Sequence, residues 1–113
     1  AADGRVLVDL IGCPDIPARA AELLRLGADV LCVHTAFDRQ QDGADPLEEL
    51  SQLLEVTPAE RAAVAGGIKP ETLPAVREFA PQIVVVGGFL AHHHQPREAA
   101  REIRELLMGE QVP

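Results

Sequence analysis

Two glycine pairs in this sequence have the type and position that phosphate chemistry requires. Gly66 and Gly67 end one short apolar run, and Gly87 and Gly88 end another. Successive glycines let the backbone approach a ligand closely and turn its N–H groups toward one point. Two such turns on neighbouring strands can hold one phosphate, and their repetition favours this reading; the alternative is two tight strand-to-helix turns. Lys69 follows the first pair and can help to neutralise a phosphate or simply be exposed.

His34 is the candidate for proton transfer. It ends the apolar run 30–34, and alternation along a strand places it on the same face as Val30 and Cys32. An imidazole at the end of a strand can act as a general acid or base near neutral pH. The alternative is a histidine that is hydrogen-bonded to a nearby backbone carbonyl.

Asp9 is a carboxylate inside the apolar run 6–11. Burying a carboxylate in a strand is costly unless the group is paired or functional. The pattern alone leaves both possibilities open: an ion pair or hydrogen bond to a neighbouring strand, or a role in the chemistry.

Two further features carry weaker signals. Asp38 lies in the loop after the run 30–34, where ligand-contacting residues often occur, or in an ordinary solvated loop. His92, His93 and His94 suggest a metal site, but three consecutive residues cannot all face one ion in a regular element. We therefore expect a solvated loop there and no metal site in this chain.

Composition limits the class of protein. The chain has 113 residues, 47% hydrophobic and 25% charged, which predicts one globular domain over residues 1–113. A net charge of −8 disfavours nucleic acid and anionic membranes as partners. Two cysteines form no disulfide framework, and no apolar run approaches the ~20 residues of a spanning helix. With no signal peptide at the N-terminus, this pattern predicts a cytoplasmic location.

Short apolar runs alternate with amphipathic segments along the chain. The runs 6–11, 30–34, 62–65 and 83–86 predict buried parallel strands. Helices are predicted at 15–26, capped by Asp15, at 46–55, capped by Asp45, from 70 to just before 81, and at 96–108.

Four successive βα units indicate a parallel α/β architecture with right-handed crossovers. Such strands form either an open sheet or half of a barrel. A complete (β/α)8 TIM barrel takes about 200–250 residues, and this chain has about half that length.

Four segments resemble the 3-hexulose-6-phosphate synthases of the orotidine 5′-monophosphate decarboxylase superfamily. They are residues 8–12, 33–38, 64–72 and 84–88, and the resemblance covers almost the whole chain in order. It implies a half barrel that corresponds to strands five to eight of a (β/α)8 barrel.

The resemblance also implies an activity and its residues. Synthases of this family are aldolase-type lyases that condense formaldehyde with D-ribulose 5-phosphate through an enediolate stabilised by Mg2+. By position, His34 matches the family histidine that moves protons on the enediolate, and Asp9 matches an acidic residue that lines the sugar-phosphate site. The backbone phosphate site is matched by Gly66, Gly67, Gly87 and Gly88.

Two positions favour the synthase over the related 3-keto-L-gulonate-6-phosphate decarboxylase. The decarboxylase typically carries an arginine three residues after the histidine, where this chain has Phe37. Gly88 stands where several members of the superfamily carry a phosphate-binding arginine. Ala36 replaces the glycine that is usual in the synthases, which is a minor departure.

The family's Asp-x-Lys-x-x-Asp motif and metal-binding acids are not found in this sequence. We therefore expect the Mg2+ ligands to lie outside this chain, and the chain alone to be inactive. An open half barrel exposes two sheet edges and an apolar face, which predicts a homodimer or pairing with a complementary N-terminal half barrel. The alternatives are a decarboxylase-like enzyme, a non-catalytic sugar-phosphate-binding subunit, and another phosphate-binding barrel half.

Overall fold

A four-stranded parallel sheet forms the centre of the protein. The computed structural model describes residues 3–36, 40, 43 and 45–109. The strands lie side by side in chain order, β1-β2-β3-β4, and each neighbouring pair is parallel. Their bounds are Leu7–Asp9 for β1, Val30–His34 for β2, Ala62–Ala65 for β3 and Ile83–Val84 for β4. This order is the one that successive right-handed βα units produce.

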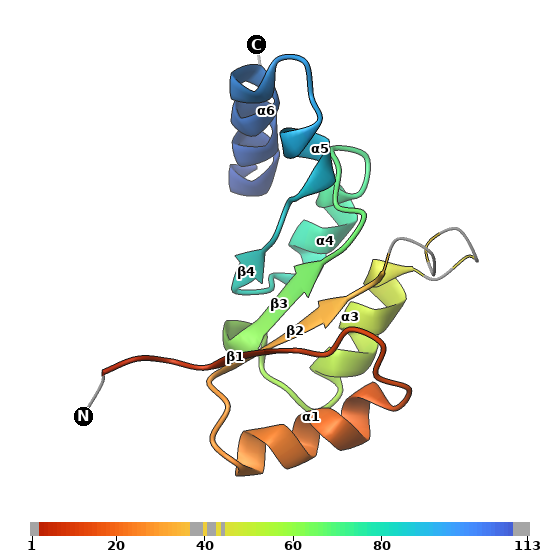
Figure 1. The fold of residues 1–113 in the computed structure, drawn as a ribbon, viewed down its shortest axis with the longest axis vertical. Coiled ribbons are helices and arrows are strands. Elements are labelled where there is room, and N and C mark those ends of the chain that lie inside the picture. The colour runs from red at the N-terminus through yellow and green to blue at the C-terminus, as the bar shows by residue number, and fades with distance from the viewer. Residues whose placement is uncertain (1–2, 37–39, 41–42, 44, 110–113) are drawn as a thin grey trace.

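Helices follow each strand and cover one side of the sheet. Figure 1 looks onto the strands, with α3 and α4 behind them and α6 next to α5 at the top of the view. The helices are α1 (Ile16–Arg25), α3 (Pro46–Leu54), the short 3-10 helix η1 (Ala59–Arg61), α4 (Leu73–Phe79), α5 (Gly88–Ala91) and α6 (Pro96–Met108). None of the helices in the described residues is both long and apolar enough to span a membrane.

Both predicted N-caps are confirmed. The Asp15 carboxylate accepts a hydrogen bond from the Ala18 N–H at 3.2 Å, and the Asp45 carboxylate accepts one from the Leu47 N–H at 2.9 Å. Each bond satisfies a donor that the first turn of a helix otherwise leaves without a partner.

The main core lies between the sheet and its helices. Alternation along β2 and β3 points half of their side chains toward α1, α3 and α4. Those side chains are buried together with the apolar stripes of the helices. Members of this core include Leu31, Val33, Ala62, Val64, Leu50, Leu53, Leu73 and Val76.

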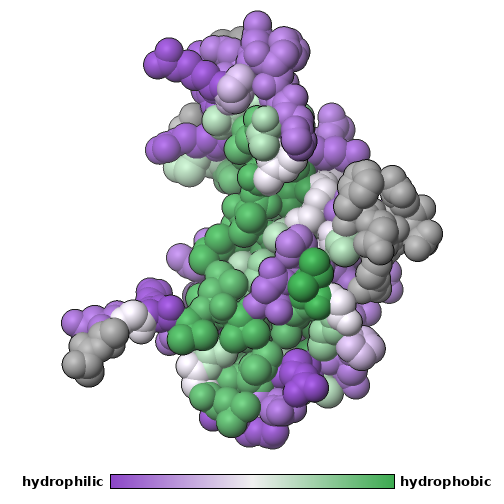
Figure 2. Space-filling model, in the orientation of Figure 1, coloured by the Kyte–Doolittle hydropathy of each residue, from purple (hydrophilic) through white to green (hydrophobic). Residues whose placement is uncertain are grey.

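The opposite face of the sheet carries no helix layer in the described part of the chain. Val30, Cys32, Ala63 and Ala65 form a small separate cluster at its centre. Toward its edges, Leu7, Ile83 and Val85 are 45%, 37% and 44% exposed. Figure 2 shows a continuous hydrophobic band over the strands in this view. We call these seven residues the inner face.

The two middle strands and the last helix are confirmed at their predicted bounds, 30–34, 62–65 and 96–108. The outer strands are shorter than predicted, because each has one neighbouring strand among the described residues and its ladder ends early. Beyond Asp9, the Ile11 N–H donates to the Asp9 carboxylate at 2.9 Å rather than to a strand. The third helix begins at Leu73 rather than near residue 70, since Thr72 and Lys69 first form a hydrogen-bonded turn. The four-residue α5 was not predicted, because so short a helix has no readable period.

Candidate functional site

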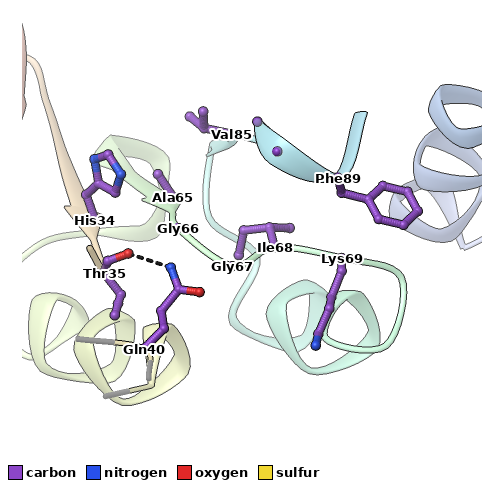
Figure 3. Close-up of a pocket in the computed structure, with 12 residues that line it drawn as sticks. His34, Thr35, Gln40, Ala65, Gly66, Gly67, Ile68, Lys69, Val85 and Phe89 are labelled. Carbon is purple, nitrogen blue, oxygen red and sulfur yellow. Dashed lines mark hydrogen bonds between the residues drawn. The ribbon is translucent and has the colours of Figure 1, made fainter. Parts of the chain in front are cut away.

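A cavity of about 630 Å³ opens where the carboxyl ends of β2 and β3 meet the segments that follow β3 and β4. In parallel α/β folds, ligands bind at the carboxyl ends of the strands. Figure 3 shows His34, Gln40 and the glycine-containing turns around this cavity. The lining residues are His34, Thr35, Gln40, Ala65, Gly66, Gly67, Ile68, Lys69, Val85, Gly87, Gly88 and Phe89.

Both glycine pairs line the same cavity, as the sequence predicts. Parallel pairing explains this, because His34 lies opposite Ala65 in the register of β2 and β3, so Gly66 follows directly beside the histidine. The turn after β4 reaches the same edge, because β4 pairs with β3.

The two glycine pairs have different structural reasons for being glycine. Gly66 and Gly67 have φ angles of +91° and +72°, a region that other residues rarely adopt. A Cβ on Gly66 would lie 2.2 Å from the carbonyl oxygen of Thr35, so this turn packs against the end of β2. A Cβ on Gly87 would meet nothing within 4 Å. Gly87, which lines the cavity, therefore has open space beside its Cα atom, as close approach of a ligand requires.

Asp9 and His34 form a cross-strand pair. Asp9 lies opposite Cys32 in the register, and His34 follows two residues later on the same face. The His34 Nδ1 atom lies 2.8 Å from the Asp9 Oδ2 atom. The Asp9 side chain is 44% exposed, so the expectation of a buried mid-strand carboxylate is wrong. Asp9 is the last residue of an edge strand on the uncovered face, which leaves its carboxylate in contact with solvent.

The contact between Asp9 and His34 bears on which ring nitrogen of His34 is available for proton transfer. When Nδ1 carries the proton that Asp9 accepts, Nε2 is the free basic nitrogen. Asp9 is not among the residues that line the cavity, and it contacts the lining through His34. The contact with the carboxylate orients the imidazole ring, and a ring held in this way is suited to general acid or base chemistry.

Cys32 is a buried, neutral thiol. Its burial raises the pKa of the thiol to about 12, and the negative charge of Asp9 adds to this effect. The neutral thiol is 3% exposed and packs with the inner face, so the prediction of a small buried hydrophobe is confirmed.

Two polar residues at the cavity, Thr35 and Gln40, are not among the site residues predicted from the sequence. Thr35 is buried and donates its hydroxyl hydrogen bond to Glu49 at 2.5 Å. Gln40 donates from Nε2 to the carbonyl oxygen of Thr35 at 2.7 Å. Neither residue belongs to a periodic pattern, and Thr35 meets Glu49 only because α3 packs against the end of β2.

Asp38 and Phe37 lie outside the described residues. Lys69 lines the cavity, but Figure 3 shows its side chain extending away from the first glycine turn and His34.

Two of the three consecutive histidines, His93 and His94, stack on each other. The rings of His93 and His94 lie 4.8 Å apart and nearly parallel, and His93 Nδ1 accepts a hydrogen bond from the Gln95 N–H. Within the described residues, no three His, Cys, Asp or Glu side chains are placed to hold a metal ion.

Mg2+ does not fit the residues that this chain brings to the cavity. Magnesium prefers several oxygen ligands in octahedral geometry. The carboxylate beside the cavity, Asp9, already contacts His34 and the Ile11 N–H. The described part of the chain therefore supplies no magnesium site of its own.

The fold and the cavity define the class of this protein: half of a (β/α)8 barrel with backbone turns and a carboxylate-paired histidine at the carboxyl edge. The chain belongs to the Orotidine 5′-phosphate decarboxylase / HUMPS family, whose model matches residues 2–103. The resemblance that the sequence predicts is thereby confirmed.

Relatives agree in sequence and in structure. The chain is 41% identical over 107 residues to the 3-hexulose-6-phosphate synthase of Staphylococcus haemolyticus strain JCSC1435, covering 95% of this chain and 51% of that relative. It is 42% identical over 105 residues to that of Staphylococcus aureus strain bovine RF122 / ET3-1, covering 93% and 50%. The crystal structure of 3-hexulose-6-phosphate synthase from Salmonella typhimurium matches with a TM-score of 0.85 and 38% identity, over 95% of this chain and 51% of that one. The chain thus spans about half the length of the relatives it matches.

Proposed function

We propose that this chain is the phosphate-binding half of a 3-hexulose-6-phosphate synthase-like aldolase, which joins formaldehyde to D-ribulose 5-phosphate. One observation carries the proposal: both glycine turns and the carboxylate-paired His34 border one cavity of about 630 Å³. The names of the relatives supply the substrate class.

Each group of this chain has a part in the proposed reaction. The backbone N–H groups of the two glycine turns bind the phosphate and thereby anchor the sugar. His34 moves protons on the carbon skeleton through Nε2, while Asp9 holds Nδ1. The Mg2+ implied by the family supplies charge stabilisation when bound, and we propose that its ligands come from outside this chain.

We further propose that the inner face is covered by a complementary (β/α)4 half barrel. The solved relatives support this occupant, because this chain matches about half of each synthase chain and leaves the other half unmatched. Exposed Leu7, Ile83 and Val85 supply the apolar contact, and the outer strands β1 and β4 supply edges for parallel pairing. The same half would bring the acids and the lysine that this chain lacks.

Mixing tests both parts of the proposal. The chain is combined with the N-terminal half of a homologous synthase, and formaldehyde consumption with D-ribulose 5-phosphate is measured. We expect activity in the mixture, none with either half alone, and a 1:1 complex by light scattering. A 1:1 complex without activity would favour a non-catalytic sugar-phosphate-binding subunit. If the chain forms a homodimer and does not bind the added half, a second copy of the chain covers the inner face.

His34 provides the mechanistic control. In the active mixture, His34→Asn should lower kcat by about 10²- to 10⁴-fold, because it removes the general acid or base. His94→Asn changes an exposed histidine away from the cavity and should leave kcat unchanged. Full activity of the His34 variant would remove this residue from the mechanism.

A further inference from the structure

Gln40 lies in the wall of the cavity between the end of β2 and the first glycine turn. Its Nε2 atom donates a hydrogen bond to the carbonyl oxygen of Thr35 at 2.7 Å. A Cβ on Gly67 would lie 2.7 Å from the Oε1 atom of Gln40, closer than real contacts allow. The missing side chain at Gly67 therefore makes the space that the carboxamide occupies.

The chemistry of Thr35 fixes the orientation of this carboxamide. The Thr35 carbonyl oxygen can only accept hydrogen bonds, so the nitrogen of the Gln40 side chain must face it. The Oε1 atom then faces the other way, toward Gly67, as Figure 3 shows. Gln40 thus presents a hydrogen-bond acceptor beside the N–H donors of the first glycine turn.

The acceptor is held in place before a ligand arrives. Thr35 is 1% exposed, and its hydroxyl is bonded to Glu49 at 2.5 Å. The backbone N–H of Gln40 donates to the carbonyl oxygen of Ala36 at 3.0 Å. Anchoring at both the backbone and the side chain reduces the entropy that Gln40 would lose on binding a ligand.

We propose that Gln40 is a specificity-determining residue, whose Oε1 atom accepts a hydrogen bond from a hydroxyl group of the sugar phosphate. The inference rests on the proposed function. An acceptor oxygen repels the ionised oxygens of a phosphate but pairs with a hydroxyl, which is a donor. Gln40 lines the same cavity as the first glycine turn and His34, so the hydroxylated carbons of a sugar phosphate bound there lie within reach of its carboxamide.

Binding of two ligands by the 15N-labelled chain tests this role. Inorganic phosphate and D-ribulose 5-phosphate are titrated separately, and the amide signals of the glycine turns report each dissociation constant. Gln40→Met keeps the length of the side chain and removes its acceptor. We expect this variant to bind D-ribulose 5-phosphate about 3- to 10-fold more weakly, while its affinity for inorganic phosphate stays unchanged.

Two further variants complete the design. Gln82→Met makes the same change at an exposed glutamine outside the cavity and should alter neither affinity. Gln40→Asn keeps an amide on a shorter side chain and should show the same selective loss, which covers the case in which Gln40→Met fails to fold.

The outcomes separate the inference from the function on which it rests. If the variant bound both ligands more weakly by the same factor, Gln40 would only support the structure of the glycine turn, and the inference would be overturned. Unchanged affinity for both ligands would overturn it as well. If neither ligand shifts the glycine signals of the unaltered chain, the proposed function itself fails.

Discussion

The imidazole Nδ1 atom of His34 lies 2.8 Å from the carboxylate Oδ2 atom of Asp9, and the two residues come from neighbouring strands. Both side chains stand on the uncovered face of the sheet, where the pair is partly solvated. A contact of this kind in water contributes little to stability. Its consequence is chemical, because it decides which nitrogen of the ring faces the cavity.

The tautomer of His34 should therefore depend on Asp9. In the neutral ring, we expect the proton on Nδ1, and Asp9→Asn should shift it toward Nε2, since the asparagine amide can donate to Nδ1. The 15N chemical shifts of the ring, assigned with His34→Asn, report this change. Asp3→Asn alters an exposed carboxylate elsewhere and should leave the tautomer as it is. An Nε2–H tautomer in the unaltered protein would contradict the prediction.

Gly66→Ala should destabilise the fold by at least about 2 kcal/mol, because it combines a positive φ with overpacking. Its Cβ would lie 2.2 Å from the carbonyl oxygen and 2.8 Å from the nitrogen of Thr35, both of them backbone atoms. Urea unfolding gives the free energy of unfolding. Gly4→Ala, where a Cβ meets nothing within 4 Å, is the matched control. Equal free energies of unfolding for the two variants would show that the turn can rearrange to accept a Cβ atom without loss of stability.

Substitution by valine should change the free energy of unfolding differently at two buried threonines. Thr35→Val removes the hydroxyl that donates to Glu49 and should lower the free energy of unfolding by about 1–3 kcal/mol. The Thr57 hydroxyl is buried and has no hydrogen-bond partner among the described residues, so Thr57→Val should be neutral or stabilising. Thermal and urea unfolding of both variants measure the difference. A greater loss at Thr57 than at Thr35 would refute this assignment of partners.

Cys32 should make the protein less stable in alkali. The pKa of its thiol rises from 9.0 to about 12 in the folded chain, so between these values the unfolded chain has lost a proton that the folded chain keeps. The free energy of unfolding then falls as pH rises above 9, by at most about 1.4 kcal/mol per pH unit from this group. Cys32→Ala should have a shallower slope than the parent chain in urea unfolding between pH 8.5 and pH 10.5. Cys13→Ala should keep the parent slope; identical slopes in all three proteins would count against the effect.

Much of the fold could be predicted because its signals are local. The apolar runs at 30–34 and 62–65 lie in strands that are buried on both faces, so their composition reports their environment. The caps at Asp15 and Asp45 depend on groups within three residues in the chain. The predicted ends of β1 and β4 are wrong, since strand length depends on the number of neighbouring strands as well as on apolar composition.

The same distinction divides the candidate site. By itself, the sequence determined the parallel βα order, and that order brings both glycine pairs and His34 to one edge, because the carboxyl ends of parallel strands coincide. Only the tertiary structure decided that Asp9 contacts Nδ1 of His34 and that Gln40 fills the space beside Gly67. Side-chain contacts between separate elements depend on register and packing to within an ångström. Residue types and their spacing along the chain do not encode distances at that scale.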